Sequence, residues 1–466
     1  MGDLGSIAGR KVTVMGLGLH GGGLASALFF ARRGAEVTVT DLRGAEVLGD
    51  SIRGLEGYRV RFVLGRHEES DFARADLVIK NPAVPPSSPF LGAARSRGVP
   101  IETDLSVFLS LAANPVLAVT GSKGKSTTAS AIAFGLARVR PGVKLGGNIT
   151  VSPLAFLEEL DSAAPVVLEL SSWQLGDLRG RGLLAPAVSA FTVILPDHLD
   201  KYPGMPEYVE DKKVLFQGQG PDAKAVFNLD DPWQREFPGE TRAQSFFYSA
   251  DPLPEWAGGA WLEAGEGRTR GLPGAAGSRT ILAGARIPGT HNRMNLLCAG
   301  LALQLYGVKA EVVRKALAEF PGVEHRLELF RDWRGIRFYN DSAATIPQAT
   351  VQALKTVEPP VALIAGGTDK NIDFSPLGEV ARIPCGIVLL AGTAAEKIRA
   401  VLEAEGTRCE GPFEELAAAV EAAVALVSTG GSVLFSPGCA SFGMFLNEFD
   451  RGRKFKETVN SLTAES

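Results

Sequence analysis

The sequence predicts an α/β protein of three domains, in which strands and helices alternate to build mostly parallel sheets. The chain has 466 residues, and a domain typically contains roughly 100–200. Short apolar runs alternate with glycine-rich turns and helical stretches, the order expected for parallel sheets covered by helices. Hydrophobic residues are 45% and charged residues 21% of the chain. These proportions are typical of a globular protein and argue against a disordered, fibrous or coiled-coil one.

The first part of the chain predicts a β-α-β unit. Residues 11–15 are expected to form a buried strand, residues 24–33 a helix after a glycine-rich turn, and residues 36–41 a second strand. Further strands are expected at 76–79 and 99–102.

The middle of the chain repeats the order of strand, glycine-rich loop and helix from residue 116 onwards. Strands are expected at 116–120, 165–170 and 190–195, and a helix near 293–305. Residues 236–288 are rich in Gly, Pro and Ala, which predicts a loop-rich insertion with short strands.

A third α/β block begins near residue 322, with strands expected at 361–365, 386–390 and 432–435. Each of these strands is followed by a turn that contains glycine. We therefore place the domains at 1–110, 111–321 and 322–466.

Charge and cysteine content exclude several classes. The net charge of -4 gives no general attraction to nucleic acid or to an anionic membrane. The four cysteines form no CxxC pair, which argues against a zinc ribbon and a disulfide scaffold. The N-terminus lacks a signal-peptide pattern, and no apolar run approaches the ~20 residues of a membrane span. These features predict a cytoplasmic protein.

The first glycine-rich turn, Gly16-Leu17-Gly18-Leu19-His20-Gly21, matches GxGxxG between a strand and a helix. Asp41 ends the next strand, as in dinucleotide sites. Such a turn brings backbone amides and a helix N-terminus to a phosphate. The motif leaves open whether the ligand is NAD or another diphosphate such as a UDP-sugar, and a plain structural turn remains the alternative.

The stretch Thr120-Gly121-Ser122-Lys123-Gly124-Lys125-Ser126-Thr127 is the strongest signal. It predicts a shortened P-loop, because Val119 stands where the full motif has its first glycine. Backbone amides would surround a β-phosphate, Lys125 would neutralise β/γ oxygens, and the Ser126 hydroxyl would bind Mg²⁺.

Two further positions are candidate metal or substrate ligands. Glu169 ends an apolar strand, as a metal-binding carboxylate does beside a P-loop. His198 follows another strand, between Asp197 and Asp200. Taken alone, a strand-end Glu is more often a cap and a single His is more often structural.

Taken together, these motifs resemble the Mur ligase superfamily along nearly the whole chain, and the N-terminal loop favours its D-glutamate-adding branch. The resemblance also rests on 80–82, 146–149, 168–175, 197–203, 289–295, 325–326, 340–342 and 436–442.

The resemblance implies a Rossmann-like UDP-binding domain, a central P-loop ATPase domain with a mostly parallel sheet, and a C-terminal Rossmann-like domain that helps bind the amino acid. It implies that ATP phosphorylates the carboxylate of UDP-N-acetylmuramoyl-L-alanine and that the amine of D-glutamate displaces phosphate from this acyl phosphate. Two Mg²⁺ ions are expected, and the enzyme is expected to be a monomer in peptidoglycan precursor synthesis that binds no nucleic acid or membrane.

The same resemblance assigns roles by position. Catalytic roles are implied for Lys125, Glu169, His198 and Lys212, and metal binding for Ser126, Glu169, His198 and Lys212. ATP binding is implied for Gly121, Ser122, Lys123, Gly124, Lys125, Ser126, Thr127, Asn292, Asn295, Arg326 and Asp341. UDP-substrate binding is implied for Gly16, Leu17, Gly18, Leu19, His20, Asp41, Arg43, Asn81, Asn148 and Ser171. Amino-acid binding is implied for Thr345, Lys370 and Ser441.

Lys212 aligns with a lysine that is carbamylated in the family. Carbon dioxide reacts with a neutral amine, whereas a free lysine has a pKa of about 10.4. Metal charge and burial would favour the neutral amine. A solvated lysine in a charged helix, beside Glu210, Asp211 and Lys213, is the alternative.

Two departures from the family pattern bear on the acceptor. Ala343 stands where the family usually has Lys. Asn447-Glu448-Phe449 stands where the family has an aromatic residue followed by an acidic one. D-glutamate is still the expected acceptor, and another amino acid such as L-glutamate is the alternative.

Three rival functions remain from the residues. An NAD-dependent oxidoreductase would leave Lys125 unused, and a P-loop binding module would leave the first glycine-rich turn unused. A folate-polyglutamate-type ligase shares the chemistry but gives no reason for the N-terminal loop.

Overall fold

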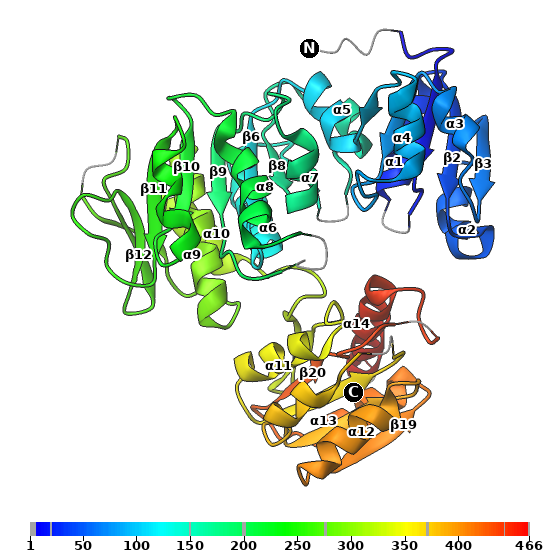
Figure 1. Ribbon diagram of the computed structural model, residues 1–466. Helices are drawn as coiled ribbons and strands as arrows, with labels where there is room; N and C mark the ends of the chain where they lie inside the picture. Colours follow the sequence, from blue (N-terminus) through cyan, green and yellow to red (C-terminus); the bar gives the residue numbers. More distant parts are fainter. Residues whose placement is uncertain are drawn as a thin grey trace. The chain divides into compact units, whose positions relative to one another are not determined.

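The computed structural model describes residues 6–18, 21–148, 151–197, 202–274, 277–369, 372–441 and 443–464. Leu19, His20, His198 and Lys370 lie outside these ranges, so nothing is said of their positions. The chain divides into two compact units, one of residues 1–283 and 294–317 and one of residues 284–293 and 318–466 (Figure 1).

The first sheet is parallel and has the order β3-β2-β1-β4-β5. Its strands are β1 (Lys11–Met15), β2 (Glu36–Asp41), β3 (Val60–Leu64), β4 (Leu77–Lys80) and β5 (Ile101–Glu102). The helices of this part are α1 (Gly22–Arg32), α2 (Ala45–Arg53), α3 (Glu69–Ala73), α4 (Pro89–Ser96) and α5 (Asp104–Leu111). The ends of β1 and β4 lie side by side, which brings the first glycine-rich loop next to Asn81.

The second sheet has nine strands in the order β14-β13-β12-β11-β10-β9-β6-β8-β7 and is parallel from β7 to β12. Its strands are β6 (Val116–Thr120), β7 (Lys144–Gly147), β8 (Val166–Glu169), β9 (Val188–Phe191), β10 (Lys224–Asn228), β11 (Gln244–Ser249), β12 (Gly259–Glu263), β13 (Glu266–Arg270) and β14 (Arg279–Leu282). The helices are α6 (Lys125–Leu136), α7 (Ser172–Leu178), α8 (Met205–Gln217), α9 (Thr290–Leu305) and α10 (Ala310–Glu319), with 3₁₀ turns at 153–155, 157–159, 232–235 and 237–239.

The third sheet has the order β15-β16-β20-β17-β18-β19, with β15 antiparallel to β16 and the others parallel. Its strands are β15 (Glu328–Trp333), β16 (Ile336–Asn340), β17 (Val361–Gly366), β18 (Gly386–Leu390), β19 (Cys409–Phe413) and β20 (Ser432–Phe435). Its helices are α11 (Pro347–Thr356), α12 (Ala395–Ala404), α13 (Leu416–Ala425) and α14 (Glu448–Ala464), with a 3₁₀ turn at 375–380.

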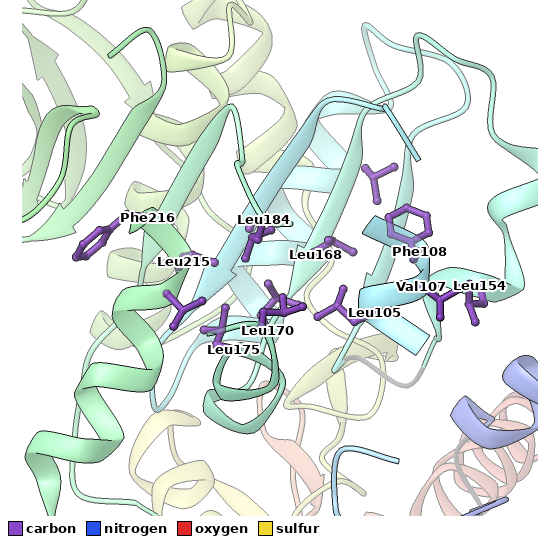
Figure 2. Packing of buried hydrophobic residues seen from close by; sticks show 14 of the residues in the cluster. Leu105, Val107, Phe108, Leu154, Leu168, Leu170, Leu175, Leu184, Leu215 and Phe216 are labelled. Atoms are coloured by element: carbon purple, nitrogen blue, oxygen red, sulfur yellow. The ribbon is translucent and has the colours of Figure 1, made fainter. Parts of the chain in front are cut away.

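One hydrophobic cluster joins the first two sheets into a single unit. It runs from Val12 and Val37 of the first sheet to Leu168 and Phe191 of the second. Figure 2 shows Phe108 of α5 among this cluster, beside Val107 and Leu154. The shared core explains why the first and second sheets behave as one compact body.

The three-domain α/β class and the mostly parallel sheets agree with the prediction, and the three sheets fall within 1–110, 111–321 and 322–466. Where one domain ends and the next begins stays a prediction. Several strand limits shift by one or two residues, and one strand differs more: the expected 190–195 is β9 at Val188–Phe191. The chain leaves the strand there because Val193 O accepts the Ser122 amide and the Leu195 amide donates to Ser122 Oγ.

The insertion at 236–288 is more regular than expected, since β11 to β14 extend the central sheet. Among the described residues, no helix is long and apolar enough to cross a membrane.

Candidate functional site

The loop at the carboxyl end of β6 has the form of a phosphate cradle. Lys125 Nζ lies 3.1 Å from Gly121 O and 3.0 Å from Ser122 O, so its ammonium folds back over the loop. Ser122 is buried, and its hydroxyl lies 2.9 Å from both Leu195 O and the Tyr208 hydroxyl. Ser122 thus shapes the loop from inside, and its role in ATP binding stays a prediction. The Lys123 ammonium is 3.3 Å from Asp197 Oδ2.

Gly124 begins α6 in a left-handed conformation, with φ of +89°. A Cβ at this position would lie 2.2 Å from Asn295 Oδ1, so the Asn295 side chain would have to move to make room for it. Asn295 therefore lies directly against the P-loop, and its role in ATP binding stays a prediction. Ser126 and Thr127 follow in the first turn of α6, where a helix N-terminus favours phosphate.

Glu169 ends β8, the strand beside β6, and is 1% exposed. Its Oε1 accepts a hydrogen bond of 2.9 Å from Asn148 Nδ2. Its Oε2 is buried and has no hydrogen-bond partner among the described residues. Ser171 follows at the start of α7, where its hydroxyl forms a capping box with Gln174. Asn148, Glu169 and Ser171 therefore meet at one end of the central sheet.

Lys212 reaches the P-loop from α8. It is 1% exposed, and its Nζ lies 2.8 Å from Gly121 O and 4.3 Å from the centre of the Tyr208 ring. Burial, with the nearby positive charge of Lys125, lowers the pKa of Lys212 well below its ordinary value, although Asp197 and Asp211 act in the opposite direction. Lys212 is thus a buried amine whose surroundings favour the neutral form, which contradicts the solvated alternative.

The residues at this end of the sheet fit a divalent cation with oxygen ligands. A buried carboxylate oxygen without a partner, as on Glu169, is costly unless a cation or donor satisfies it. Carboxylate and hydroxyl oxygens, the donors of Glu169 and Ser126, are the ligands Mg²⁺ prefers. The remaining expected ligand, His198, lies outside the described residues.

The first glycine-rich loop, between β1 and α1, has the close packing of a phosphate-binding turn. A Cβ on Gly23 would lie 2.2 Å from Gly16 O, so the helix can approach the loop only with glycine there. A Cβ on Gly16 would lie 3.0 Å from Asn81 Cβ, which places Asn81 against the loop. Leu17 is completely buried, so a ligand contact from it would come from its backbone.

Asp41 organises this loop. Its Oδ2 accepts from the Gly18 amide at 3.1 Å and its Oδ1 from the Arg43 amide at 2.9 Å. The Arg43 side chain itself is exposed. The structure thus brings Gly16, Gly18, Asp41, Arg43 and Asn81 together at the carboxyl edge of the first sheet, where α/β proteins bind ligands.

Asp341 lies in the second unit, after β16, and is nearly buried. It accepts hydrogen bonds from the Leu327 amide at 3.0 Å and from Ser436 Oγ at 2.7 Å. Burial raises the pKa of Asp341 to about 7. Arg326 is exposed and precedes Leu327, and its positive charge acts to lower the pKa of Asp341. Asn292 donates to Pro288 O at 2.7 Å.

The expected amino-acid-binding positions lie on two loops that are tied together. The Gly438 amide donates to Ala344 O at 3.0 Å, which joins the loop of Thr345 to the loop of Ser441. Ser441 is buried and Thr345 is partly exposed. Lys370, the third expected residue, lies outside the described residues.

Two residues, one in each compact unit, were missed at the sequence level. Tyr208 precedes Lys212 by one helical turn, a spacing that places both on one face of α8 and that a search for neighbours of Lys212 would have found. Arg451 is completely buried and donates to Ser342 O at 2.7 Å and Cys439 O at 3.0 Å. Nothing in its sequence surroundings indicates that it would be buried.

Three family models match successive parts of the chain. They are the Mur ligase MurD-like N-terminal domain at residues 10–103, the Mur ligase middle domain at 119–303, and the Mur ligase glutamate ligase domain at 325–439.

Relatives that match along nearly the whole chain belong to the same family as these domain models. A UDP-N-acetylmuramoylalanine–D-glutamate ligase of Roseiflexus sp. is 42% identical over 98% of this chain and 100% of the relative. One of Treponema pallidum is 38% identical over 97% of this chain and 98% of the relative.

The crystal structure of UDP-N-acetylmuramate-alanine ligase MurC from Thermotoga maritima shares the fold, with a TM-score of 0.62 at 22% identity over 97% of this chain and all of that one. MurF ligase from Thermotoga maritima in complex with ADP has a TM-score of 0.55 at 19% identity, over 98% of this chain and 97% of that one. With all three domain models in order and relatives of this identity along its length, the chain belongs to the Mur ligase family.

Proposed function

We propose that this chain is an ATP-dependent ligase that adds D-glutamate to UDP-N-acetylmuramoyl-L-alanine in peptidoglycan precursor synthesis. The observation that carries the proposal is the meeting of Lys125, Lys212 and Glu169 around one phosphate loop, in a unit that also holds a second, dinucleotide-type loop. The names of the full-length relatives support the choice of both substrates.

ATP binds in this proposal at the P-loop. Gly121, Gly124, Lys125, Ser126 and Thr127 enclose the phosphates, and Asn295 already lies against Gly124. The structure of MurF ligase in complex with ADP supports nucleotide binding by this chain. Asn292, Arg326 and Asp341 are proposed to contribute further nucleotide contacts.

The γ-phosphoryl group passes from ATP to the free carboxylate of the UDP-substrate, which forms an acyl phosphate and leaves ADP. The amine of glutamate then attacks the acyl carbon, and inorganic phosphate leaves as the amide bond forms. Lys125, whose ammonium lies over the loop, neutralises charge on the transferring group.

Ser126, Glu169, His198 and carbamylated Lys212 are proposed to hold Mg²⁺. When bound, Mg²⁺ would neutralise charge on phosphoryl oxygens. The unpartnered Oε2 of Glu169 supports this assignment.

Carbamylation of Lys212 is supported by its burial and lowered pKa. The neutral amine would attack carbon dioxide, one N–C bond would form and a proton would leave, which gives a carboxylate in place of an ammonium.

Glutamate is the proposed acceptor even though Glu448 occupies the start of α14. The Glu448 carbonyl accepts a hydrogen bond of 2.7 Å from Ser342 Oγ, and Asn447 Oδ1 caps the amides of Phe449 and Asp450. The backbone of this helix end is therefore well fixed, and its partial positive charge suits an acceptor carboxylate.

An ADP-release assay with UDP-N-acetylmuramoyl-L-alanine and a panel of D-glutamate, L-glutamate, D-aspartate and D-lysine tests the proposal. We expect turnover with D-glutamate, formation of the amide product, and no nicotinamide-dependent reaction. The variant Glu448→Ala should keep the same preference. A preference for lysine that changes to glutamate in Glu448→Ala would identify the side chain as the selector and overturn the proposed acceptor.

We further propose that the enzyme acts in the cytoplasm as a monomer, with the domain limits 1–110, 111–321 and 322–466. Sedimentation of the full chain with and without nucleotide tests the monomer, and a concentration-dependent increase in mass would contradict it.

A further inference from the structure

A buried ion pair links the first sheet to the helix that follows Glu169. Lys80, the last residue of β4, is 6% exposed. Its Nζ lies 2.7 Å from Oδ2 of Asp177 in α7. The same ammonium has one other described contact, at 3.4 Å from Val84 O. Lysine is rarely buried unless it is paired, so Asp177 is what keeps Lys80 in this place.

On its own sheet, Lys80 belongs to the edge that carries the glycine-rich loop. It pairs in register with Met15, the residue before Gly16. A cavity of about 20 Å³ lies beneath the loop, with Gly16, Lys80, Asn81 and Asp104 in its lining. The two neighbouring side chains therefore have different partners. Asn81 packs on the glycine-rich loop, and Lys80 pairs with Asp177 of α7, a helix of the second sheet.

The other partner is part of a helix held from two sides. Besides Asp177, the end of α7 is held to the first sheet by a second ion pair, in which Arg181 lies 2.6 Å from Glu102. Toward α8, Arg179 lies 2.6 Å from Asp211, the neighbour of Lys212. A Cβ on Gly176 would lie 2.8 Å from Asp211 Oδ2, so α7 and α8 are in direct contact.

The start of α7 carries the chemistry. Glu169, Leu170 and Ser171 lead directly into this helix, and Ser171 caps it. A displacement of α7 would therefore move the groups proposed to face the reacting carboxylate.

We propose that Lys80 is a positioning residue, which through its ion pair with Asp177 sets α7, and with it Glu169 and Ser171, relative to the glycine-rich loop of the first sheet. This inference rests on the proposed function, because one substrate must place its diphosphate on that loop and its carboxylate near Glu169. A small error in such placement lowers the rate of the chemical step much more than it lowers binding of the distant diphosphate.

The experiment compares Lys80→Met, Asp177→Asn and the double variant in the full chain. The control is Lys144→Met. Lys144 lies in the same compact unit, and its ion pair with Glu159 is exposed. The measurements are kcat and KM for the UDP-substrate at saturating ATP, affinity for UDP by calorimetry, and hydrogen exchange of α7 amides with and without UDP-substrate.

We expect both single variants to lower kcat by about 10- to 100-fold, while affinity for UDP changes by less than about twofold. The double variant should be no slower than the slower single variant, because both changes break one interaction. In both singles, UDP-substrate should no longer slow exchange in α7. Retained UDP binding shows that each variant is folded, and Asp177→Asn provides the test if Lys80→Met does not fold.

Two results would overturn the inference. If Lys80→Met loses UDP affinity and Asp177→Asn behaves as wild type, Lys80 contacts the diphosphate itself. If both variants turn over like Lys144→Met, the pair is merely structural. Wild-type turnover in the same assay tests the proposed function separately, and α7 exchange reports on positioning even if that turnover is absent.

Discussion

At the scale of single residues, Lys212 is an amine whose surroundings disfavour its own protonated form. It is almost fully buried, its one described hydrogen bond goes to Gly121 O, and the charge of Lys125 opposes its own. An amine in such surroundings is neutral for more of the time than a free lysine, which is the state that reacts with carbon dioxide.

Replacing Lys212 by alanine should therefore reduce ligation at least about 100-fold, and an added short carboxylic acid should partly restore it by replacing the carbamate. Lys213→Ala is the matched control, because Lys213 is paired at the edge of α8 with Glu240 at 2.8 Å. Initial rates with and without added acid give the answer. If the rate of Lys212→Ala did not rise with added acid and equalled that of Lys213→Ala, carbamylation would be contradicted.

Asp341 gives a prediction about pH. Burial raises its pKa from 3.8 to about 7, so the folded chain holds a proton that the unfolded chain releases above about pH 4. Its contribution to stability is complete below that pH and is lost as the pH rises through about 7. The loss amounts to as much as about 4 kcal/mol.

The urea midpoint of the nucleotide-free chain should fall between pH 5 and pH 8, and Asp341→Asn should flatten this dependence. Asp332→Asn, at an exposed position of β15, should leave the dependence intact. An equal slope in all three proteins would show that other groups cause it.

At the scale of elements, local patterns predicted most of the parallel strands. Residues 11–15, 36–41, 116–120, 386–390 and 432–435 form strands with these same limits, because short runs rich in β-branched and apolar residues, separated by turns, favour buried strands. The strand expected at 190–195 was displaced because its second half bonds to Ser122, a partner 70 residues earlier in the chain. A pattern of neighbours in sequence contains no information about such a partner.

A single methyl group added to the P-loop should have a large effect on nucleotide binding. In Gly124→Ala, a left-handed backbone and a Cβ 2.2 Å from Asn295 Oδ1 both oppose the native loop. We expect ADP affinity to fall at least about tenfold, with a loss of stability beyond the roughly 1–2 kcal/mol of left-handed strain alone.

Gly98→Ala is the control for Gly124→Ala. Gly98 also has a positive φ, of +68°, but no atom lies within 4 Å of its added Cβ. It should show only the conformational cost and normal ADP binding by calorimetry. Equal losses in both variants would mean that the contact with Asn295 is unimportant.

At the scale of the whole molecule, the sequence predicted which candidate site residues lie at the ends of strands. It did not predict the distant residues that these side chains contact. Glu169 and Lys125 were predicted from their motifs, and the structure places both at one end of the central sheet. The Lys80–Asp177 pair and Arg451 were not predicted, because each depends on segments distant in sequence. Burial lowers the pKa of Arg451 to about 10, and its partners are the carbonyls of Ser342 and Cys439 and the Ser342 hydroxyl, which no motif specifies.

The separation of the two loops on different sheets predicts a separation of their functions. Lys125 folds over the P-loop of the second sheet, whereas Gly16, Asp41 and Asn81 lie at the edge of the first. Lys125→Ala should abolish ligation and weaken ATP binding, because it removes the cation that faces the phosphates. It should leave the affinity for UDP-N-acetylmuramoyl-L-alanine within about twofold, because the diphosphate of that ligand is proposed to bind at the first loop and not at the P-loop.

Calorimetry with each ligand in turn checks this prediction, and Arg43→Ala supplies the reciprocal variant. Arg43 follows Asp41 at the first loop, so its loss should weaken the UDP-substrate and spare ATP. A pair of variants with opposite effects on the two ligands would show that one chain holds two independent nucleotide sites. If Lys125→Ala lowered both affinities equally, the P-loop would have to contact the UDP-substrate as well, and the assignment of one ligand to each sheet would be wrong.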